Sequence, residues 1–354
     1  MGRRHVSEPA IVYGAGAACP LGLTPPTIFA AVNAGIRRFI EIESVMDAAG
    51  KPAHGCRLSS LEIEDPFERA TWFARHAIAD ALRPLTTRPG VAIPIFVAGP
   101  TGSRAAPRSE SLGRVLREAT PEHLELSWGP DSIIAEGRAG GAAALEAAFV
   151  ALGSVPFVLI GGIDCQVAGS ALHDLAQRNR LLGNRNCDGR LPGEGAAFVL
   201  LGRRGMLPAD AGLGLIHTVV RSRDPRPFDG ELANQALGLS DVFARLRLNW
   251  SSRVDEIVAA QSTERYWGTE LATAYLRNAE LMPEPMLVRQ LGNALGDCGA
   301  AAFPLGLTWA LDDLAPRAWR ECSARSALVY SSSDAGFVGA ALISAPPPGR
   351  QRSS

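Results

Sequence analysis

The sequence predicts an α/β protein whose strands are largely buried and mostly parallel. Two observations lead to this class. Short apolar runs rich in β-branched residues alternate with alanine-rich stretches of helical length along most of the chain. The apolar runs are also continuous rather than alternating, which is typical of strands that are covered on both faces.

Strand and helix candidates follow one another in a regular order. The strand candidates are residues 10–13, 93–98, 157–160, 197–201, 214–220, 256–260 and 327–330. The helix candidates are residues 27–34, 66–82, 141–152, 241–246, 269–278 and 300–313. Each strand candidate is a short apolar run with branched or aromatic side chains, whereas most helix candidates are longer and richer in alanine or leucine.

A weak internal repeat indicates a duplicated α/β unit. The segment "GRAGGAAALEAAFVAL" leads into "VPFVLIGGID", and "GDCGAAAFPLGLTWAL" leads into "SALVYSSSD". Each consists of a glycine-rich turn, an alanine-rich helix, a strand and a turn ending in aspartate. We therefore expect an N-terminal half over residues 1–204 and a C-terminal half over residues 205–345. Together they form one compact unit, followed by a disordered tail over residues 346–354.

Composition excludes several functional classes. The chain has 354 residues and a formal net charge of −1, so no basic surface for nucleic acid is expected. Lys51 is its sole lysine, which removes Schiff-base chemistry. No apolar stretch is long enough to span a membrane, and the N-terminus lacks a signal-peptide pattern. The expected location is therefore the cytoplasm.

Neither a metal site nor a cofactor is indicated. The six cysteines are scattered without CxxC pairing, which fits a reducing compartment rather than a zinc site or a disulfide framework. The stretch "GAGAACPLG" begins like a dinucleotide-binding turn. It departs from that pattern at Cys19 and at Pro20, where a helix would have to be running. No nicotinamide or flavin is expected.

The stretch "AEGRAGGAAALEAAFVAL", residues 135–152, predicts a helix with an unusual entrance. Gly137, Gly140 and Gly141 crowd its first turn and would allow a ligand or another backbone to come close. The free N–H groups of a helix N-terminus favour an anion. Arg138 instead places a fixed positive charge there. Something must compensate that charge.

Several segments, in order along the chain, resemble the β-ketoacyl synthases of the thiolase superfamily. They are "GAGAACPLGLTPPTIFAAVNAGI", "FVLIGGID", "PGEGAAFVLL", "VDEIVAAQSTERYWGTELA", "GNALGDCGAAAFPLGL" and "SSSDAGFVGAALI". The resemblance implies a five-layer αβαβα sandwich built from two duplicated halves. The chain departs from the family by being short and by abbreviating the segment before Gly193 to "NRNCDGRL".

The same resemblance implies that catalysis has been lost. Active synthases carry a cysteine nucleophile at the head of the first alanine-rich helix, with two histidines that favour its thiolate and polarise the thioester. Arg138 takes the cysteine position, with Gly137 as the alternative alignment. Gln261 and Asn293 take the histidine positions. Amides donate hydrogen bonds but do not shuttle protons near neutral pH. No catalytic residue is therefore expected.

A residual pocket would remain around the lost centre, lined by Glu136, Gly137, Cys298, Asp334, Ala335 and Phe337. Asp334 and Glu136 are the candidate partners for Arg138. Two replacement nucleophiles stay open: Cys298, and Cys165 with His173 and Asp174 nearby in sequence. Tyr266 and Trp267 are expected either to line a groove or to pack in the core.

The resemblance leaves three functions open. Residues 32–52, "VNAGIRRF…MDAAGKP", resemble short degenerate synthase-like proteins associated with type VI secretion, which implies a non-catalytic accessory that contacts an effector or spike protein. "AEGRAGGAAAL" resembles chain-length factors, the inactive partners of ketosynthases in polyketide or aryl polyene assembly. The third is an acyltransferase with a repurposed nucleophile.

These functions share an expected association with another protein. The family implies a homodimer, or a heterodimer with a sister thiolase-fold subunit, and the possible partners include a ketosynthase or acyl carrier protein. Association would follow an edge strand near the first alanine-rich helix, for which "VPFVLIGG" is apolar enough to be buried on both faces.

Overall fold

The computed structural model describes residues 8–85, 91–101, 116, 118, 120, 122, 124–228, 233–315 and 325–346. Within them, one large mixed sheet runs in the order β11-β10-β12-β13-β9-β1-β8-β7-β4-β5, and β6 also pairs with β4. Its strands are β1 (Ala10–Ala18), β4 (Val91–Ala98), β5 (Leu124–Ser127), β6 (Ile133–Ile134), β7 (Phe157–Cys165), β8 (Glu194–Gly202), β9 (Gly214–Arg223), β10 (Glu256–Ala259), β11 (Val288–Gln290), β12 (Ser326–Ser332) and β13 (Phe337–Ser344).

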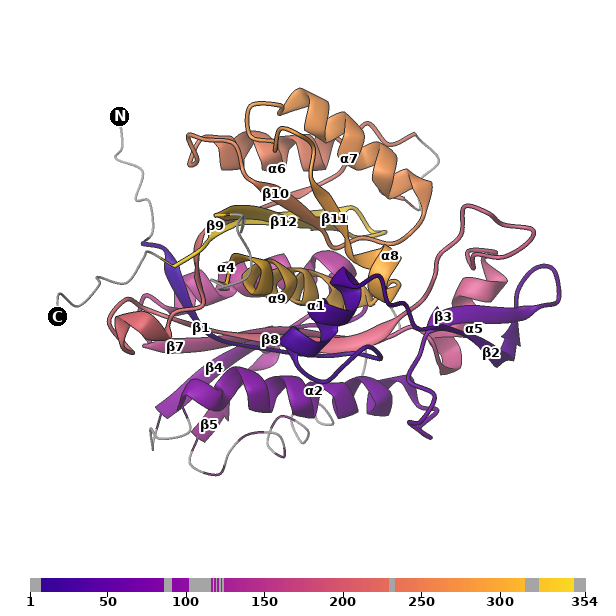
Figure 1. Cartoon of the computed structure of the whole chain (residues 1–354), viewed down its shortest axis with the longest axis horizontal. Coiled ribbons are helices and arrows are strands. Elements are labelled where there is room, and N and C mark those ends of the chain that lie inside the picture. Colours follow the sequence, from indigo (N-terminus) through magenta and orange to yellow (C-terminus); the bar gives the residue numbers. More distant parts are fainter. Residues whose placement is uncertain are drawn as a thin grey trace.

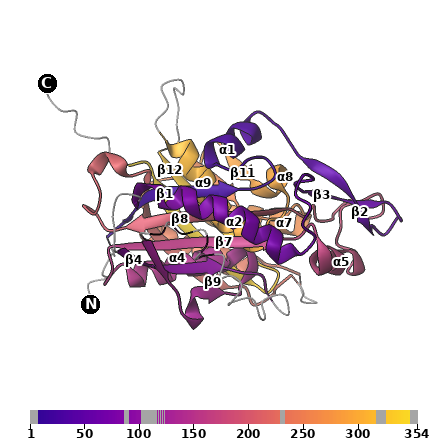
Figure 2. The same cartoon turned by 90° about the horizontal axis from the view of Figure 1, so that it is seen from below.

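Helices cover both faces of this sheet. They are α1 (Pro25–Asn33), α2 (Pro66–Leu82), α4 (Gly140–Ala151), α5 (Gly169–Gln177), α6 (Leu237–Arg247), α7 (Arg265–Arg277), α8 (Leu291–Leu295) and α9 (Ala302–Leu314). A separate hairpin of β2 (Phe39–Met46) and β3 (Pro52–Cys56) projects at one end of the molecule near α5 (Figures 1 and 2). None of the helices described is long and apolar enough to cross a membrane.

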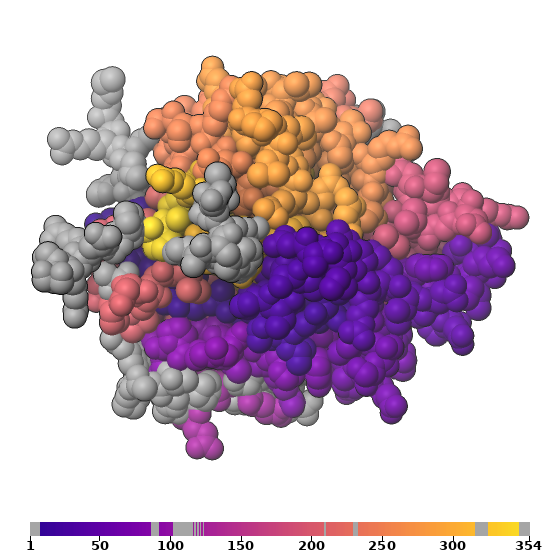
Figure 3. Space-filling model, viewed as in Figure 1, coloured from indigo at the N-terminus to yellow at the C-terminus, as the bar shows by residue number. Residues whose placement is uncertain are grey.

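The layers alternate as α, β, α, β, α (Figure 1). Helices α6 and α7 cover the β9–β13 part of the sheet, and α2 covers the outer face of β1, β8 and β7. Helices α4 and α9 lie between the two parts of the sheet, where their side chains share one core with Val199 of β8 and Val329 of β12. The space-filling view shows the C-terminal part seated on the N-terminal part (Figure 3). This is the thiolase-like fold predicted from the sequence.

The glycines at the head of α4 permit the close packing of the two central helices. A Cβ atom added to Gly141 would lie 2.7 Å from Cδ of Pro304 and 2.9 Å from Cβ of Phe303, both on α9. A Cβ added to Gly162 of β7 would lie 2.3 Å from the carbonyl oxygen of Ala300, just before α9. The glycine-rich entrance of α4 therefore accommodates the neighbouring helix.

The predicted elements occur at or close to their expected positions, and α2 has the predicted limits, 66–82. The expectation of mostly parallel strands is wrong. Strand β4 pairs in parallel with β5, β6 and β7, and β10 does so with β11 and β12, but the five pairings that join β12, β13, β9, β1, β8 and β7 in series are antiparallel. A continuous apolar run indicates that a strand is buried on both faces, but it does not indicate whether the strand is parallel or antiparallel to its neighbours.

The run "VPFVLIGG" does not form a sheet edge. It contributes most of β7, which pairs with β8 on one side and β4 on the other. Its apolar character comes from a central position in the sheet, so the expectation of an association edge along it is wrong. The predicted disordered tail, apart from residue 346, lies outside the described residues.

Candidate functional site

Arg138 lies in a 3-10 turn, Gly137–Ala139, that leads directly into α4. Gly137 has a φ of +62°, a left-handed conformation that glycine adopts without steric cost, and its N–H donates to the carbonyl of Gly99. The turn directs the Arg138 side chain into the interior, where it is 3% exposed. A positive charge buried at the positive end of a helix requires close compensation.

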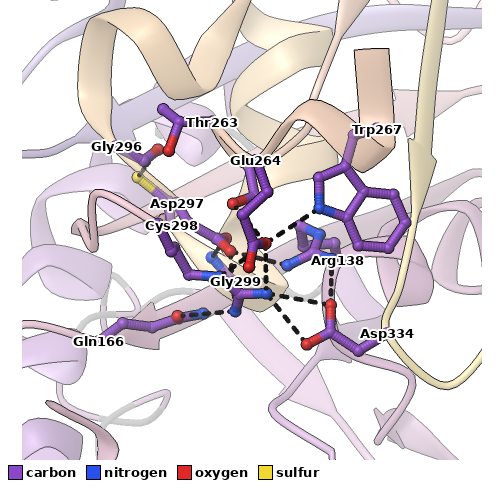
Figure 4. Close-up of polar contacts among 12 residues, drawn as sticks. Arg138, Gln166, Thr263, Glu264, Trp267, Gly296, Asp297, Cys298, Gly299 and Asp334 are labelled. Carbon is purple, nitrogen blue, oxygen red and sulfur yellow. Dashed lines mark hydrogen bonds and ion pairs between the residues drawn. The ribbon is translucent and has the colours of Figure 1, made fainter. Parts of the chain in front are cut away.

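Two aspartates and a carbonyl supply that compensation. Nη1 of Arg138 donates to Oδ2 of Asp297 at 2.7 Å, Nη2 donates to Oδ1 of Asp334, and Nε donates to the carbonyl of Ser332 at 3.0 Å. The guanidinium also lies 4.5 Å from the ring centre of Trp267, close enough for a cation–π interaction. The predicted pairing of Arg138 with Asp334 is confirmed (Figure 4).

Arg138 belongs to a larger group that we call the arginine–carboxylate cluster. Its members are Arg138, Arg180, Arg190, Glu264, Asp297 and Asp334. Glu264 accepts from Arg180 at 2.8 Å and from Arg190 at 3.1 Å. Nη1 of Arg190 lies 3.1 Å from Oδ2 of Asp297. Three positive and three negative charges are thus enclosed together.

The cluster joins the two predicted halves of the chain. Its arginines all precede residue 191, in the turn before α4 and in the segment between α5 and β8. Its carboxylates all follow residue 263: Glu264 is the N-cap residue of α7, Asp297 follows α8, and Asp334 lies in the turn between β12 and β13. Every ion pair in the cluster therefore connects an N-terminal cation with a C-terminal anion.

Asp334, Asp297 and Arg138 of the cluster stay charged at neutral pH. Burial alone would raise the pKa of Asp334, but the guanidinium groups of Arg190, Arg138 and Arg180 outweigh burial and hold that pKa well below its usual value. The pKa of Asp297 is also lowered, because Arg138 and Arg190 outweigh its burial. Burial opposes the charge on Arg138, yet Asp297 and Asp334 keep its pKa above the usual value.

The two amides predicted at histidine positions lie in different environments. Gln261 is buried, and with its amide oriented to satisfy its neighbours, it donates to the carbonyl of Ser332 at 3.1 Å and accepts from the Ser332 N–H at 2.7 Å. It therefore shares Ser332 with Arg138. Asn293 is exposed, donates to Gln290 at 2.7 Å, and is not part of the cluster.

A cavity of about 790 Å³ lies against the cluster. Of the residues predicted around the lost centre, Gly137, Arg138, Asp334 and Ala335 line it. Glu136 does not, and its predicted pairing with Arg138 is wrong, because Glu136 binds Arg221 at 2.6 Å. Phe337 also lies off the cavity wall and packs under the guanidinium of Arg223, 4.9 Å from its ring centre.

Neither candidate cysteine has the surroundings of a nucleophile. Cys298 is completely buried, its Sγ faces backbone carbonyls, and burial raises its pKa well above the usual value. Cys165 lines the cavity, but its thiol lies 3.3 Å from a carboxylate oxygen of Glu194 and burial raises its pKa likewise.

His173 and Asp174 do not activate Cys165. His173 is exposed, and its Nδ1 lies 3.1 Å from the carbonyl of Gly169, one turn earlier in α5. Asp174 accepts from Arg178, the C-cap residue of α5, at 3.0 Å. These three residues therefore do not form a cysteine–histidine site.

The two aromatic residues in the first turn of α7 pack against other rings, and neither lines the cavity beside the cluster. Trp267 donates from Nε1 to Glu264 at 3.2 Å and is 2% exposed. Tyr266 packs edge-on against Phe228 and Trp267 and bonds to the carbonyl of Arg226. Trp267 thereby helps to hold Glu264 and Arg138 in place.

Sequence reasoning missed four of the six cluster members: Arg180, Arg190, Glu264 and Asp297. One signal was available. Asp297, in "LGDCGAAAF", and Arg190, between Gly189 and Leu191, have apolar or glycine neighbours, where a charged side chain is commonly buried only with a partner. Arg180 and Glu264 have polar neighbours and carried no such signal. The partners themselves are far away in sequence and could not be assigned.

Comparisons with solved structures agree on the fold. The chain is similar to a chain of the AntDE:AntF complex, in which a type II polyketide synthase acyl-carrier protein binds its ketosynthase. The TM-score is 0.75 and the sequence identity is 15%, and the match covers 96% of this chain and 100% of that chain. The chain also resembles the ishigamide ketosynthase/chain length factor at a TM-score of 0.71 and 17% identity, covering 96% of this chain and 99% of the other.

A β-ketoacyl synthase from Burkholderia phymatum STM815 gives a TM-score of 0.71 and 15% identity, with 96% and 99% of the two chains covered. At these identities the likeness defines the class of fold, the thiolase-like fold of ketosynthases and chain-length factors. No protein-family model and no curated protein matches the sequence. Within the described residues, no group of three or more histidine, cysteine or acidic side chains is arranged to hold a metal ion.

Proposed function

We propose that this protein is a non-catalytic thiolase-fold subunit that acts by associating with other proteins. The observation that carries the proposal is the place of Arg138 at the head of α4, locked between Asp297 and Asp334. By resemblance, this is where a ketosynthase holds its nucleophile. A guanidinium does not form a thioester, and its permanent charge prevents it from acting as a base.

The groups around Arg138 do not replace the missing chemistry. The carboxylates of the cluster are each engaged by arginines, and the lowered pKa values of Asp297 and Asp334 make them poor proton acceptors. Gln261 binds backbone and carries no titratable proton. The arrangement stabilises charge within the fold rather than charge that develops on a substrate.

Acylation measured by intact-protein mass spectrometry tests the loss of catalysis. The protein would be incubated with an acyl-coenzyme A and with malonyl-coenzyme A, using Cys187→Ser to remove the exposed thiol and Cys322→Ser to remove the thiol outside the described residues. We expect no covalent acyl adduct. An adduct mapped to Cys165 or Cys298 would contradict the proposal and favour the acyltransferase with a repurposed nucleophile.

The preferred partner class is a second thiolase-fold subunit of the ketosynthase type. Two facts support it: "AEGRAGGAAAL" resembles chain-length factors, and structures with this fold include ketosynthase/chain-length-factor and acyl-carrier-protein assemblies. Affinity isolation of the tagged protein from its native host, together with its mass in solution, tests this. We expect a heterodimer with a ketosynthase. A homodimer without a ketosynthase would contradict this partner.

The type VI secretion role predicts a different partner and a different surface. It rests on residues 32–52, which cover the end of α1, the segment that leads into the projecting hairpin, β2 and the turn between β2 and β3. If a spike or effector protein is recovered instead, replacing the exposed hairpin residues Glu41, Glu43 and Met46 by alanine tests the surface. Loss of that partner would favour the secretion role.

A further inference from the structure

We propose that Arg138, Arg180 and Arg190 form a binding site for the carboxylate group of a ligand in the adjoining cavity, and that the side chain of Asp334 is its internal occupant. All three guanidinium groups converge on Asp334. Arg180 Nη1 lies 2.6 Å from Oδ2, Arg190 Nη2 lies 3.0 Å from Oδ2 and 3.1 Å from Oδ1, and Arg138 Nη2 donates to Oδ1.

The three arginines are held in place without Asp334. Nη1 of Arg138 is fixed by Asp297 and its Nε by a carbonyl. Nε and Nη2 of Arg180 each lie 2.8 Å from a different oxygen of Glu264. Arg190 is held by Glu264 and Asp297 together. The donors that face Asp334 therefore keep their directions when its carboxylate leaves, as a preorganised binding site requires.

Aromatic rings add to this support. The Arg180 guanidinium lies 3.9 Å from the ring centre of Phe228, and that of Arg138 lies 4.5 Å from Trp267. Stacking suits the planar guanidinium and restricts its orientation.

The net charge of the site favours a ligand group with a single negative charge. Glu264 and Asp297 balance two of the three positive charges, so displacement of the Asp334 carboxylate leaves one positive charge at the site. A carboxylate matches both this charge and the planar donor geometry of arginine. A dianion such as hydrogen phosphate would leave an excess negative charge beside Glu264 and Asp297.

Asp334 is the exchangeable member because it faces the cavity. Its side chain is 25% exposed, whereas those of Asp297 and Glu264 are 0% and 4% exposed. Asp334 lines the cavity, and the other two carboxylates do not. A ligand entering the cavity therefore meets Asp334 before any other carboxylate of the cluster.

Part of the cavity wall is apolar and suits an apolar body on the ligand, although polar residues such as Gln166 and His173 also line the cavity. Phe67 and Ala70 of α2, Val97 of β4, Ile163 of β7 and Leu175 of α5 line the same cavity. Its volume of about 790 Å³ is in the range of small-molecule sites. The chemical class is thus a carboxylic acid with a short apolar chain, for which octanoate is a suitable probe.

Calorimetric titration of octanoate into wild-type protein and Asp334→Ala at pH 7.5 tests the site. The variant should bind at least tenfold more tightly, because the internal competitor is gone. Asp334→Asn is the matched control: it keeps the shape of the side chain without its charge, and should bind with intermediate affinity. If Asp334→Ala does not fold, Asp334→Asn replaces it as the test variant, and its octanoate affinity is compared with that of wild type. Octanamide, which lacks the charge, should gain nothing from either variant.

Further variants test the arginines and the apolar wall. Adding Arg180→Gln to Asp334→Ala should cost at least tenfold in octanoate affinity. Acetate should bind the Asp334→Ala variant more weakly than octanoate does. Equal octanoate affinity in wild type and both variants, or equal gains for octanamide, would overturn the proposal. Acetate binding as tightly as octanoate would overturn the apolar part of the ligand class.

The site does not depend on the absence of catalysis. An acylated thiol in the mass-spectrometric experiment would overturn the proposed function and leave the octanoate results unaffected. Conversely, the absence of an octanoate site would leave the assignment of a non-catalytic subunit standing.

Discussion

Nη1 of Arg138 lies 2.7 Å from Oδ2 of Asp297, and the two side chains are 3% and 0% exposed. They come from opposite halves of the chain and meet at the head of α4. Asp297 also contacts Arg190 and accepts from the backbone N–H of Gly299 at 2.8 Å. It is the most deeply buried anion of the arginine–carboxylate cluster.

Replacing Asp297 by alanine should strongly destabilise the protein. Two buried guanidinium groups would lose a shared counter-charge, and breaking a buried pair from one side costs about 3–5 kcal/mol. Urea unfolding followed by circular dichroism measures the change. As a control, Asp241→Ala removes a half-exposed pair with Arg245 and should cost less than about 1 kcal/mol. Equal effects of the two variants would contradict this role.

A second buried pair joins α2 to the sheet. Nε and Nη2 of Arg69 each lie 2.7 Å from a different oxygen of Glu194 on β8, and both side chains are 0% exposed. Glu194→Gln keeps the shape but leaves the buried guanidinium uncompensated, so we expect a loss of about 3 kcal/mol in the free energy of unfolding.

The matched control is Glu64→Gln. Glu64 pairs with Arg57 but is 72% exposed, so its change should be within about 1 kcal/mol of zero. Chemical denaturation of both variants provides the comparison. A Glu194→Gln variant as stable as wild type would show that the charge of this pair contributes nothing to the fold.

Thiol labelling should separate the exposed cysteine from the buried ones. Cys187 is exposed, whereas Cys19, Cys56, Cys165 and Cys298 are buried and burial raises the pKa of each thiol. In a Cys322→Ser background at pH 7.5, iodoacetamide should modify Cys187 alone within minutes. Peptide mass mapping identifies the site, and urea should expose the others. Rapid modification of Cys165 in the folded protein would contradict this.

Glu270 should make stability depend on pH. Burial raises its pKa from 4.5 to about 7, although Ser332 and Asn234 donate to it at 2.7 and 3.2 Å. The folded state therefore holds this proton when the unfolded state has released it. The resulting stability is complete below pH 4.5 and is lost as pH rises through about 7, by about 3 kcal/mol at most.

Glu270→Gln removes this dependence. Relative to wild type, the variant should gain stability between about pH 5 and pH 8, as measured by urea unfolding at several pH values. Glu280→Gln, at a side chain that is 79% exposed, serves as the control and should show no such trend. A stability difference that stays constant across this range would refute the prediction.

Local pattern predicted most of the elements and one end of the site, although it missed the β2–β3 hairpin, β5, β11 and α5. Residues 66–82 form a single helix, as their apolar spacing predicts, and its N-cap Asp65 accepts from the N–H groups of Phe67 and Glu68. The glycines before α4 and the charge of Arg138 are equally local. They predicted a buried cation in need of an acid, and Asp334 is one such acid.

The sequence by itself therefore determined the α/β class, the positions of most elements and the unfavourable place of the Arg138 charge at the N-terminus of a helix. Tertiary structure decided strand direction, the central place of β7 and the remaining members of the cluster. Arg138 and Asp297 are 159 residues apart, and no periodicity relates them. Their contact exists because α4 and α9 cross between the two parts of the sheet, which brings the turns that precede both helices to one point.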